Sequence, residues 1–221
     1  MANTTPERIK LGKWPPWPIA PADTLADMQD DIDRTLLTAP QIAERLGELA
    51  DQITRDIEAV TGLSDPDHPH NTLTIIPIMT GSIIFVADLV RRLPLRMKIY
   101  PMHALSYPGK STTSQGVTLS RVDDRVPEEL GGEHILLVDD ILDSGSTLRK
   151  VTAEIERRGP ATLHSCVLLR KQRDQAMAYP IDYVAFDIPD EFVVGYGLDY
   201  DDMYRNLPEI VTLKPEVVSP S

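Results

Sequence analysis

Carboxylates and hydroxyls stand close together in the stretch "ILLVDDILDSGSTLRK", residues 135–150. Asp139 and Asp140 end an apolar run, and Asp143 is followed directly by the segment 144–147, which reads Ser-Gly-Ser-Thr. Carboxylates accept hydrogen bonds from the hydroxyls of a sugar and are ligands for Mg²⁺. Backbone N–H groups at the start of a helix point at a bound phosphate, and the helix dipole favours its charge. The combination predicts a cradle for a ribose phosphate.

Other interpretations of the same acids fit less well. A magnesium-dependent nucleoside-triphosphate site would also need a G-x-x-x-x-G-K-[ST] loop, and the sequence contains none. The phosphate-accepting acids of a signalling receiver are hard to reconcile with the hydroxyl run that follows them. A solvated acidic turn rarely combines two acids at the end of a buried strand with such a run. The cradle also explains the loop, because Gly145 lets the backbone approach a phosphate and Ser144, Ser146 and Thr147 add hydroxyl donors.

The surrounding chain is patterned as strands that alternate with helices. Strands that are apolar on both faces are expected at 73–79, about 97–105, 134–139, 162–171 and 183–188. Helices are expected at 83–93 and about 145–158. This order predicts an α/β fold with a central, mostly parallel sheet flanked by helices. Ligands of such sheets bind beyond the carboxyl ends of the strands. Asp139 and Asp140 lie at such an end, and we expect them to act together only because the strand ends there.

A further helix is predicted directly after residue 38. Thr38 and Gln41 fit a capping box, with a proline tolerated in the first turn. The segment 64–71 is expected as a loop, and its His68 and His70 have no third ligand nearby, which disfavours a metal site. The apolar face of the helix is expected to contain Ile42, Leu46, Leu49, Ile53, Ile57 and Val60.

The length of 221 residues predicts one sizeable domain, which we place at 37–221. Residues 1–36 are expected to form an arm, because they hold the proline-dense stretch "KWPPWPIAP" with Trp14 and Trp17. We expect an extended segment packed on the body or on a neighbouring subunit. A proline-rich ligand for another domain is the alternative.

Composition and net charge limit the cellular compartment and the binding partners that we expect. With 34 acidic and 22 basic residues, the formal net charge is −12, which argues against nucleic-acid binding through a basic face. A polyanionic substrate therefore needs local cations or a metal. No apolar stretch is long enough for a membrane span, and the N-terminus lacks the apolar core of a secretory signal, so we expect a cytoplasmic protein. The single cysteine, Cys166, lies in an apolar run and is expected to be a buried, inert thiol.

The motif "ILLVDDILDSGST" (135–147) resembles the PRPP-binding motif of the type I phosphoribosyltransferases. Further matches, which together span about residues 38–208, point to the hypoxanthine-guanine branch. "PIMTGSIIFVADLVRRL" resembles its first pyrophosphate loop and the following helix, and "LSYPGKSTTSQG" resembles its mobile catalytic loop. "LLRK" and "FDIPDEFVVGYGLDYDDMYRNLPEI" resemble its purine-binding segment. The resemblance implies the type I phosphoribosyltransferase fold, with a small hood formed by the N- and C-terminal segments.

The implied reaction belongs to purine salvage. The 5-phosphoribosyl group of PRPP moves to N9 of hypoxanthine or guanine, which gives IMP or GMP and pyrophosphate. The implied cofactor is Mg²⁺, with Asp139, Asp140 and Asp199 as its protein ligands. Asp139 and Asp140 also hold the ribose hydroxyls, and the 5′-phosphate is bound by Ser144, Gly145, Ser146 and Thr147.

The resemblance assigns the remaining roles as well. Asp143 is the general base that takes the proton from purine N7. Lys171 donates to O6, Phe192 stacks on the base, Val193 offers its backbone to the base edge, and Asp199 lies near the guanine amino group. The pyrophosphate-binding residues are Thr80, Gly81, Ser82 and Arg205, and the lid residues are Ser106 and Tyr107. Thr80 departs from much of the family, which often has a basic residue there, so a positive charge is lost.

Two alternatives stay open at this point. An enzyme that prefers xanthine is one, because backbone placement near Val193 and Asp199 decides how the 2-substituent is read. The other is a non-catalytic regulator that binds PRPP as an effector. The presence of Asp143, Lys171 and Phe192, together with the negative charge, disfavours the regulator. The family further implies a homodimer or homotetramer whose partners are small-molecule substrates rather than nucleic acid or membrane.

Overall fold

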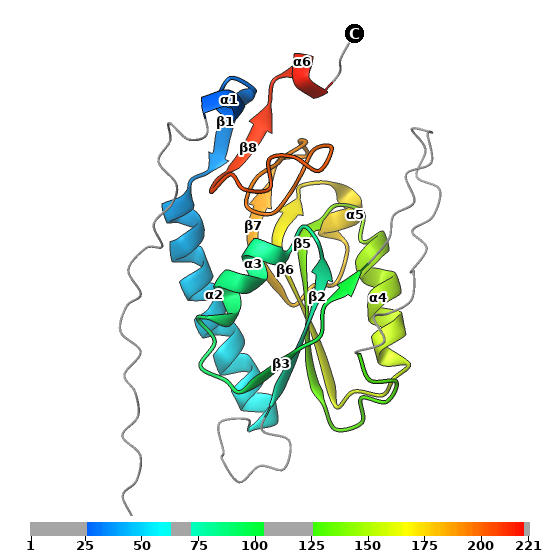
Figure 1. Ribbon diagram of the computed structural model, residues 1–221. Helices are drawn as coiled ribbons and strands as arrows, with labels where there is room; N and C mark the ends of the chain where they lie inside the picture. Colours follow the sequence, from blue (N-terminus) through cyan, green and yellow to red (C-terminus); the bar gives the residue numbers. More distant parts are fainter. Residues whose placement is uncertain (1–25, 63–71, 104–125, 219–221) are drawn as a thin grey trace, which may run out of the picture.

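The computed structural model describes residues 26–62, 72–103 and 126–218 (Figure 1). The tryptophans of the expected arm, the two histidines at 68 and 70, and Ser106 and Tyr107 of the expected lid lie outside the described residues. Their roles therefore stay predictions.

A parallel sheet forms the centre of the molecule, in the order β3-β2-β5-β6-β7, and a short β4 pairs with the end of β2. The predicted α/β class is confirmed. One boundary prediction was wrong, because β5 continues past Asp140 to Leu142. The strand expected at about 97–105 is instead divided into β3 and β4 within the described residues. The strands are β2 (Leu73–Met79), β3 (Met97–Ile99), β4 (Met102–His103), β5 (His134–Leu142), β6 (Thr162–Lys171) and β7 (Tyr183–Ile188).

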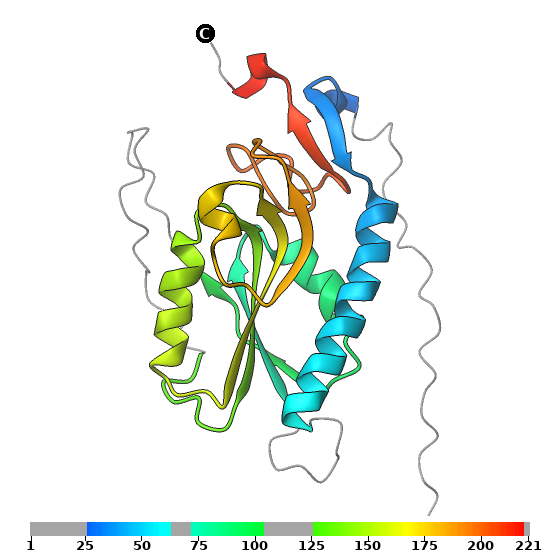
Figure 2. The ribbon, with the colours of Figure 1, turned by 180° about the vertical axis from the view of Figure 1, so that it is seen from behind.

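Helices cover both faces of this sheet, as Figures 1 and 2 show from opposite sides. Helices α2 (Ala39–Thr61) and α3 (Ile83–Val90) pack on one face in a common apolar cluster. Helix α4 (Ser146–Glu156) packs on the other face. The capping box at Thr38 is confirmed, and the predicted apolar face of α2 is buried except at its end: Val60 is 65% exposed, so that assignment was wrong.

A small hood lies beyond the carboxyl ends of the central strands (Figure 1). Its two-stranded antiparallel sheet joins β1 (Ile32–Leu37) to β8 (Ile210–Leu213), so the N- and C-terminal segments meet there as expected. Helices α1 (Ala26–Gln29) and α6 (Pro215–Val218) flank these strands. Leu207 and Val211 belong to the small apolar core of the hood. The chain that follows β7 is attached to the hood, because Val194 pairs with Val211 of β8.

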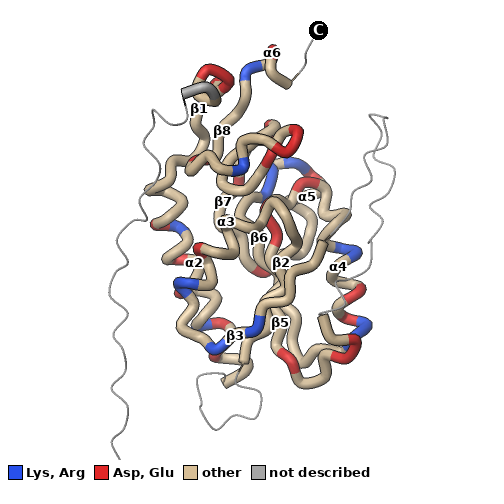
Figure 3. The backbone as a smooth tube through the Cα atoms, in the orientation of Figure 1, with Lys and Arg blue, Asp and Glu red and all other residues tan. Residues whose placement is uncertain are grey.

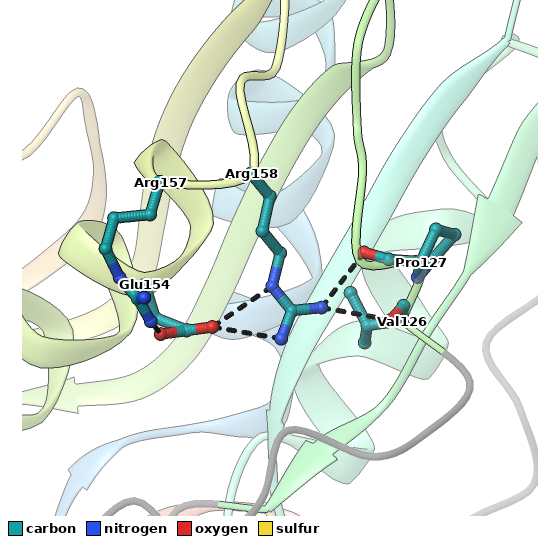
Figure 4. Close-up of polar contacts among 5 residues, drawn as sticks. All are labelled: Val126, Pro127, Glu154, Arg157 and Arg158. Atoms are coloured by element: carbon teal, nitrogen blue, oxygen red, sulfur yellow. Dashed lines mark hydrogen bonds and ion pairs between the residues drawn. The ribbon is translucent and has the colours of Figure 1, made fainter.

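Arg158 fixes the far end of α4 to the chain that enters β5 (Figure 4). Its Nη1 donates to the backbone carbonyls of Val126 and Pro127, both at 3.0 Å. Its Nε and Nη2 donate to Glu154 Oε1 at 3.1 and 3.0 Å, and Arg157 pairs with the same carboxylate. Because α4 is held at this end, its N-terminal residues are presented at a fixed place beside the end of β5.

The environment of the single cysteine and the polarity of the helices can be compared with the expectations from the sequence. Cys166 is fully buried on β6, and burial raises the pKa of its thiol, as expected for an unreactive core cysteine. No helix among the described residues is long and apolar enough to cross a membrane.

Candidate active site

Two adjacent acids lie on β5 at the point where it leaves β2. The pairing between β2 and β5 ends at Val138, whereas β5 continues beside β6. Asp139 is only 5% exposed, and its Oδ1 accepts the backbone N–H of Asp140 at 3.0 Å. Burial raises the pKa of Asp139 well above its usual range, and the charge of Asp140 raises it further. The two acids therefore lie together although the strand continues, because β5 is no longer paired with β2 at this point.

The carboxylate of Asp140 faces the loop that follows β2. Burial raises the pKa of Asp140, while hydrogen bonds and the charge of Arg205 oppose that rise. A side chain on Gly81 would place its Cβ 1.5 Å from Asp140 Oδ2, so only glycine allows this approach. The Met79–Thr80 peptide bond is cis, and the Ser82 hydroxyl donates to the carbonyl of Ile78 at 2.5 Å. The structure thus brings the predicted pyrophosphate loop directly against the acids of β5.

A second loop, which contains Gly197, lies against the predicted pyrophosphate loop at Gly81. Gly197 has φ +106, and a Cβ there would lie 2.2 Å from the backbone oxygen of Gly81. Arg205 Nη1 donates to the carbonyl of Gly197 at 2.9 Å and pairs with Asp199 Oδ1 at 2.8 Å. The other oxygen of Asp199 accepts the N–H of Asp202 at 3.0 Å. Asp199 and Arg205 therefore lie together, beside the loop that contains Thr80.

The N-terminus of α4 forms another part of the site. Gly145 has φ +74 and precedes the helix, and the ring of Tyr179 lies so close that a Cβ would be 2.6 Å from it. Arg149 lies over the same ring, 5.5 Å from its centroid. Ser144 and Ser146 are exposed, and Thr147 is half-buried. Tyr179 thus supports the loop from one side and leaves the two serine side chains open to a phosphate.

A group of four charged residues lies at the carboxyl ends of β5, β6 and β7. Lys171 Nζ is 3.5 Å from Asp143 Oδ2 and 3.5 Å from Asp190 Oδ1. Arg173 donates to Asp143 Oδ1 through Nη1, and its Nε is 3.3 Å from Asp190 Oδ2. Basic and acidic residues accordingly gather at the α5 end of the sheet in Figure 3. Asp143 and Lys171, which are far apart in the sequence, are brought together.

Sequence reasoning missed Arg173 and Asp190 in this group. Arg173 follows Lys171 by two residues at the start of the short helix α5 (Asp174–Met177), and Asp190 follows β7. Both lie in or next to the segments that match the family. Their opposite charges at the ends of neighbouring parallel strands are the signal that could have found them.

Phe192 follows β7 by a few residues and is 49% exposed. Its ring makes a T-shaped contact with the ring of Tyr200, at a centroid distance of 5.7 Å and an interplanar angle of 82°. Val193 beside it is buried. An exposed aromatic ring held from one side suits stacking on a flat base better than a place in the core.

The described residues contain no group of three or more His, Cys, Asp or Glu side chains that could hold a metal ion by themselves. A Mg²⁺ site does not need such a group, because this ion is often bound by one or two carboxylates together with phosphate oxygens of the substrate. Asp139 and Asp140 fit that pattern, since their carboxyl groups are adjacent and their pKa values are raised by burial.

Comparisons with known proteins agree with this geometry. The family model described as "Phosphoribosyl transferase domain" matches residues 34–201, which defines the class of the protein as a phosphoribosyltransferase. The hypoxanthine-guanine phosphoribosyltransferase of Mycobacterium tuberculosis is 40% identical over 90% of this chain and 95% of its own length. That of Streptococcus pneumoniae is 35% identical over 87% of this chain and 99% of its own. The chain belongs to the hypoxanthine-guanine phosphoribosyltransferase family and is a transferase.

Solved structures show the same similarity. A variant of Trypanosoma cruzi hypoxanthine phosphoribosyltransferase, described as a ternary complex with substrates, has a TM-score of 0.74 and 36% identity. The match covers 86% of this chain and all of that one. A hypoxanthine-guanine phosphoribosyltransferase from Bacillus anthracis has a TM-score of 0.69 and 34% identity, covering 83% of this chain and all of that one.

Proposed function

We propose that this chain transfers the 5-phosphoribosyl group of PRPP to N9 of hypoxanthine or guanine and releases pyrophosphate. The observation that carries the proposal is a donor and an acceptor placed side by side: Lys171 Nζ and Asp143 Oδ2, 3.5 Å apart. A 6-oxopurine that is protonated at N7 presents the complementary pair on one edge, O6 as acceptor and N7–H as donor. Adenine presents an amine in place of O6, so Lys171 would meet a second donor.

In the proposed mechanism, N9 of the base attacks the anomeric carbon of the ribose as the bond from that carbon to pyrophosphate breaks. Asp143 accepts the proton from N7, a role that requires a carboxylate within hydrogen-bond reach of the base. Phe192 stacks on the purine, and the backbone of Val193 contacts its edge. Because the transition state separates a cationic sugar from a polyanion, catalysis depends mainly on positioning and on control of charge.

The other residues hold PRPP in this proposal. Asp139 and Asp140 accept hydrogen bonds from the ribose hydroxyls. The N–H groups and hydroxyls of residues 144–147 bind the 5′-phosphate, with the dipole of α4 adding favourable charge. The amides of residues 80–82 and the guanidinium of Arg205 bind pyrophosphate, and the planar fork of that guanidinium suits phosphate oxygens.

Magnesium is the proposed cofactor, with Asp139 and Asp140 as its protein ligands. The ion, when bound, neutralises negative charge on pyrophosphate as that group departs. Asp199 is the third candidate ligand. Its contact with Arg205, at 2.8 Å, has to open or be shared before its carboxylate is free for a cation.

The proposal also covers the setting of the enzyme, as a cytoplasmic homodimer or homotetramer. The study of a Trypanosoma cruzi relative concerns its oligomeric state and activity, which makes assembly a natural question for this chain. Light scattering coupled to size exclusion, with and without PRPP and Mg²⁺, measures the mass in solution. A monomer under both conditions would contradict the proposed assembly.

The decisive assay measures pyrophosphate release with PRPP and Mg²⁺ in separate reactions with hypoxanthine, guanine, xanthine and adenine. Turnover with the first two and none with adenine is expected. Dominant turnover with xanthine would keep the mechanism and overturn the proposed specificity. No turnover with any base, together with tight PRPP binding, would favour the non-catalytic regulator.

A further inference from the structure

We propose that Arg173, supported by Asp190, is a positioning residue that determines which oxygen of Asp143 faces the purine. The inference rests on the proposed function, in which Asp143 accepts the N7 proton. It concerns residues outside the set that the family resemblance assigns.

The arrangement of the four charged groups carries the inference. Arg173 Nη1 donates to Oδ1 of Asp143, whereas Lys171 Nζ lies 3.5 Å from Oδ2 of the same carboxylate. The two oxygens of Asp190 also have different partners. Its Oδ2 lies 3.3 Å from Arg173 Nε, and its Oδ1 lies 3.5 Å from Lys171 Nζ. Each carboxylate therefore gives one oxygen to the guanidinium and turns the other toward the lysine.

This division leaves Oδ2 of Asp143 as the oxygen that can take a proton. A separation of 3.5 Å from Lys171 is longer than a good hydrogen bond, so Oδ2 is not blocked, while Oδ1 is engaged by Arg173. Without the guanidinium, the carboxylate can rotate about its Cβ–Cγ bond. Either oxygen could then turn away from the base.

Arg173 is itself held on a rigid part of the fold. Its backbone N–H donates to the carbonyl of Lys171 at 2.8 Å, and Gln172 N–H donates to Ile188 at the end of β7, also at 2.8 Å. The turn after β6 is thus attached to the neighbouring strand. It presents Lys171 and Arg173 from the same short segment.

The exposure of the group argues that its role is orientation rather than stability. The side chains of Arg173, Asp143 and Asp190 are 40%, 45% and 42% exposed, and ion pairs this exposed add little to folding free energy. Loss of Arg173 should therefore leave unfolding unchanged and reduce catalysis, which distinguishes positioning from a structural role.

The test compares Arg173→Gln with the matched control Arg170→Gln. Arg170 lies on β6 and also pairs with a carboxylate at 2.6 Å, but its partner is Asp187 rather than Asp143. Steady-state pyrophosphate release with hypoxanthine should fall by roughly 10- to 100-fold in Arg173→Gln, the scale of a small misplacement of a reacting group. The KM for PRPP and the melting temperature should not change. Arg173→Lys should recover part of the loss, and Arg170→Gln should behave like the wild type.

A double variant shows whether Arg173 acts through Asp143. In the Asp143→Asn background, Arg173→Gln should cause no further loss of kcat, because residues that act as one unit are not additive. Equal losses in both backgrounds, or wild-type kcat in Arg173→Gln, would overturn the inference while leaving the proposed function intact. A wild-type protein that turns over no base would refute the proposed function and this inference with it.

Discussion

The contact between Gly197 and Gly81 gives the sharpest test of how the site is assembled. A Cβ at position 197 would lie 2.2 Å from the backbone oxygen of Gly81, a separation that has to grow by about 1 Å to reach the ordinary range of close carbon–oxygen contacts. The oxygen belongs to the backbone of the proposed pyrophosphate loop and cannot rotate away as a side-chain atom could. Gly197→Ala therefore has to push the two loops apart, or to distort one of them.

Both stability and catalysis should respond to Gly197→Ala. The φ of +106 is unfavourable for alanine and costs about 1–3 kcal/mol of unfolding free energy. A displacement of about 1 Å in residues that are proposed to position pyrophosphate should reduce kcat/KM for PRPP by roughly 100-fold. Initial rates of pyrophosphate release at varied PRPP, together with urea unfolding, measure the two effects.

Variants at two other glycines separate the effect of backbone strain on stability from the effect of the loop contact on catalysis. Gly62 also has a left-handed φ, +63, but a Cβ at this position would meet no atom within 4 Å, so Gly62→Ala should lower stability and leave kcat/KM unchanged. Gly47 lies within α2 in open space, and Gly47→Ala should stabilise the helix by about 0.5–1 kcal/mol. Wild-type kinetics in Gly197→Ala would refute the reasoning that this contact positions the loop.

The remaining predictions concern catalysis, folding and pH. Asp143→Asn should keep PRPP binding, measured by calorimetry, and lower turnover by roughly 100-fold or more; unchanged turnover would exclude Asp143 as the general base. Arg158→Met leaves the carbonyls of Val126 and Pro127 without their donor and should lower the unfolding free energy by roughly 1–3 kcal/mol. Urea titrations measure this change, and a value near zero would contradict the role of Arg158 in holding the end of α4. Burial raises the pKa of Asp182, but contacts with His164 and hydrogen bonds from Ser165 outweigh it, so the net pKa is lowered. That lowered pKa gives stability that is present above the unfolded value of about 3.9 and is lost as pH falls through the folded value. Asp182→Asn should therefore flatten the acid side of the stability curve, and an unchanged acid side would refute this assignment.

The apolar patterns predicted the central sheet well, because strands buried on both faces have long runs of branched residues. The hood was implied by the resemblance, yet its strand β1 has no comparable signal, and β8 is a buried run of only four residues. β1 reads "IDRTLL" and is largely exposed, and its pairing joins Ile32 to Leu213 across almost the whole chain. Val60 fits the helical period but lies in the last turn of α2, where it is 65% exposed. Local periodicity gives no information about where a neighbouring element ends.

In the candidate site, some residues could be found from sequence motifs, whereas other contacts are evident only in the folded structure. Adjacency in the sequence joined Asp139, Asp140 and Asp143, and the family pattern added Lys171. No local pattern indicates that Arg173 pairs with Asp143 or that Asp190 contacts both Lys171 and Arg173, because these contacts depend on how the ends of β6 and β7 are placed. Likewise, the approach of Gly197 to Gly81 joins two loops more than a hundred residues apart.

Most of the positive charge around the proposed site is offset by neighbouring acids. On the base side, Lys171 and Arg173 are balanced by Asp143 and Asp190. On the pyrophosphate side, Arg205 is paired with Asp199, and Thr80 supplies no positive charge.

Burial raises the pKa values of Asp139 and Asp140, so these two acids carry negative charge less readily than exposed carboxyl groups do. A polyanion that enters this side therefore finds little net positive charge, because Arg205 is already paired with Asp199. Under the proposed function, we expect the affinity of PRPP for this chain to depend more strongly on Mg²⁺ than it would if position 80 were basic.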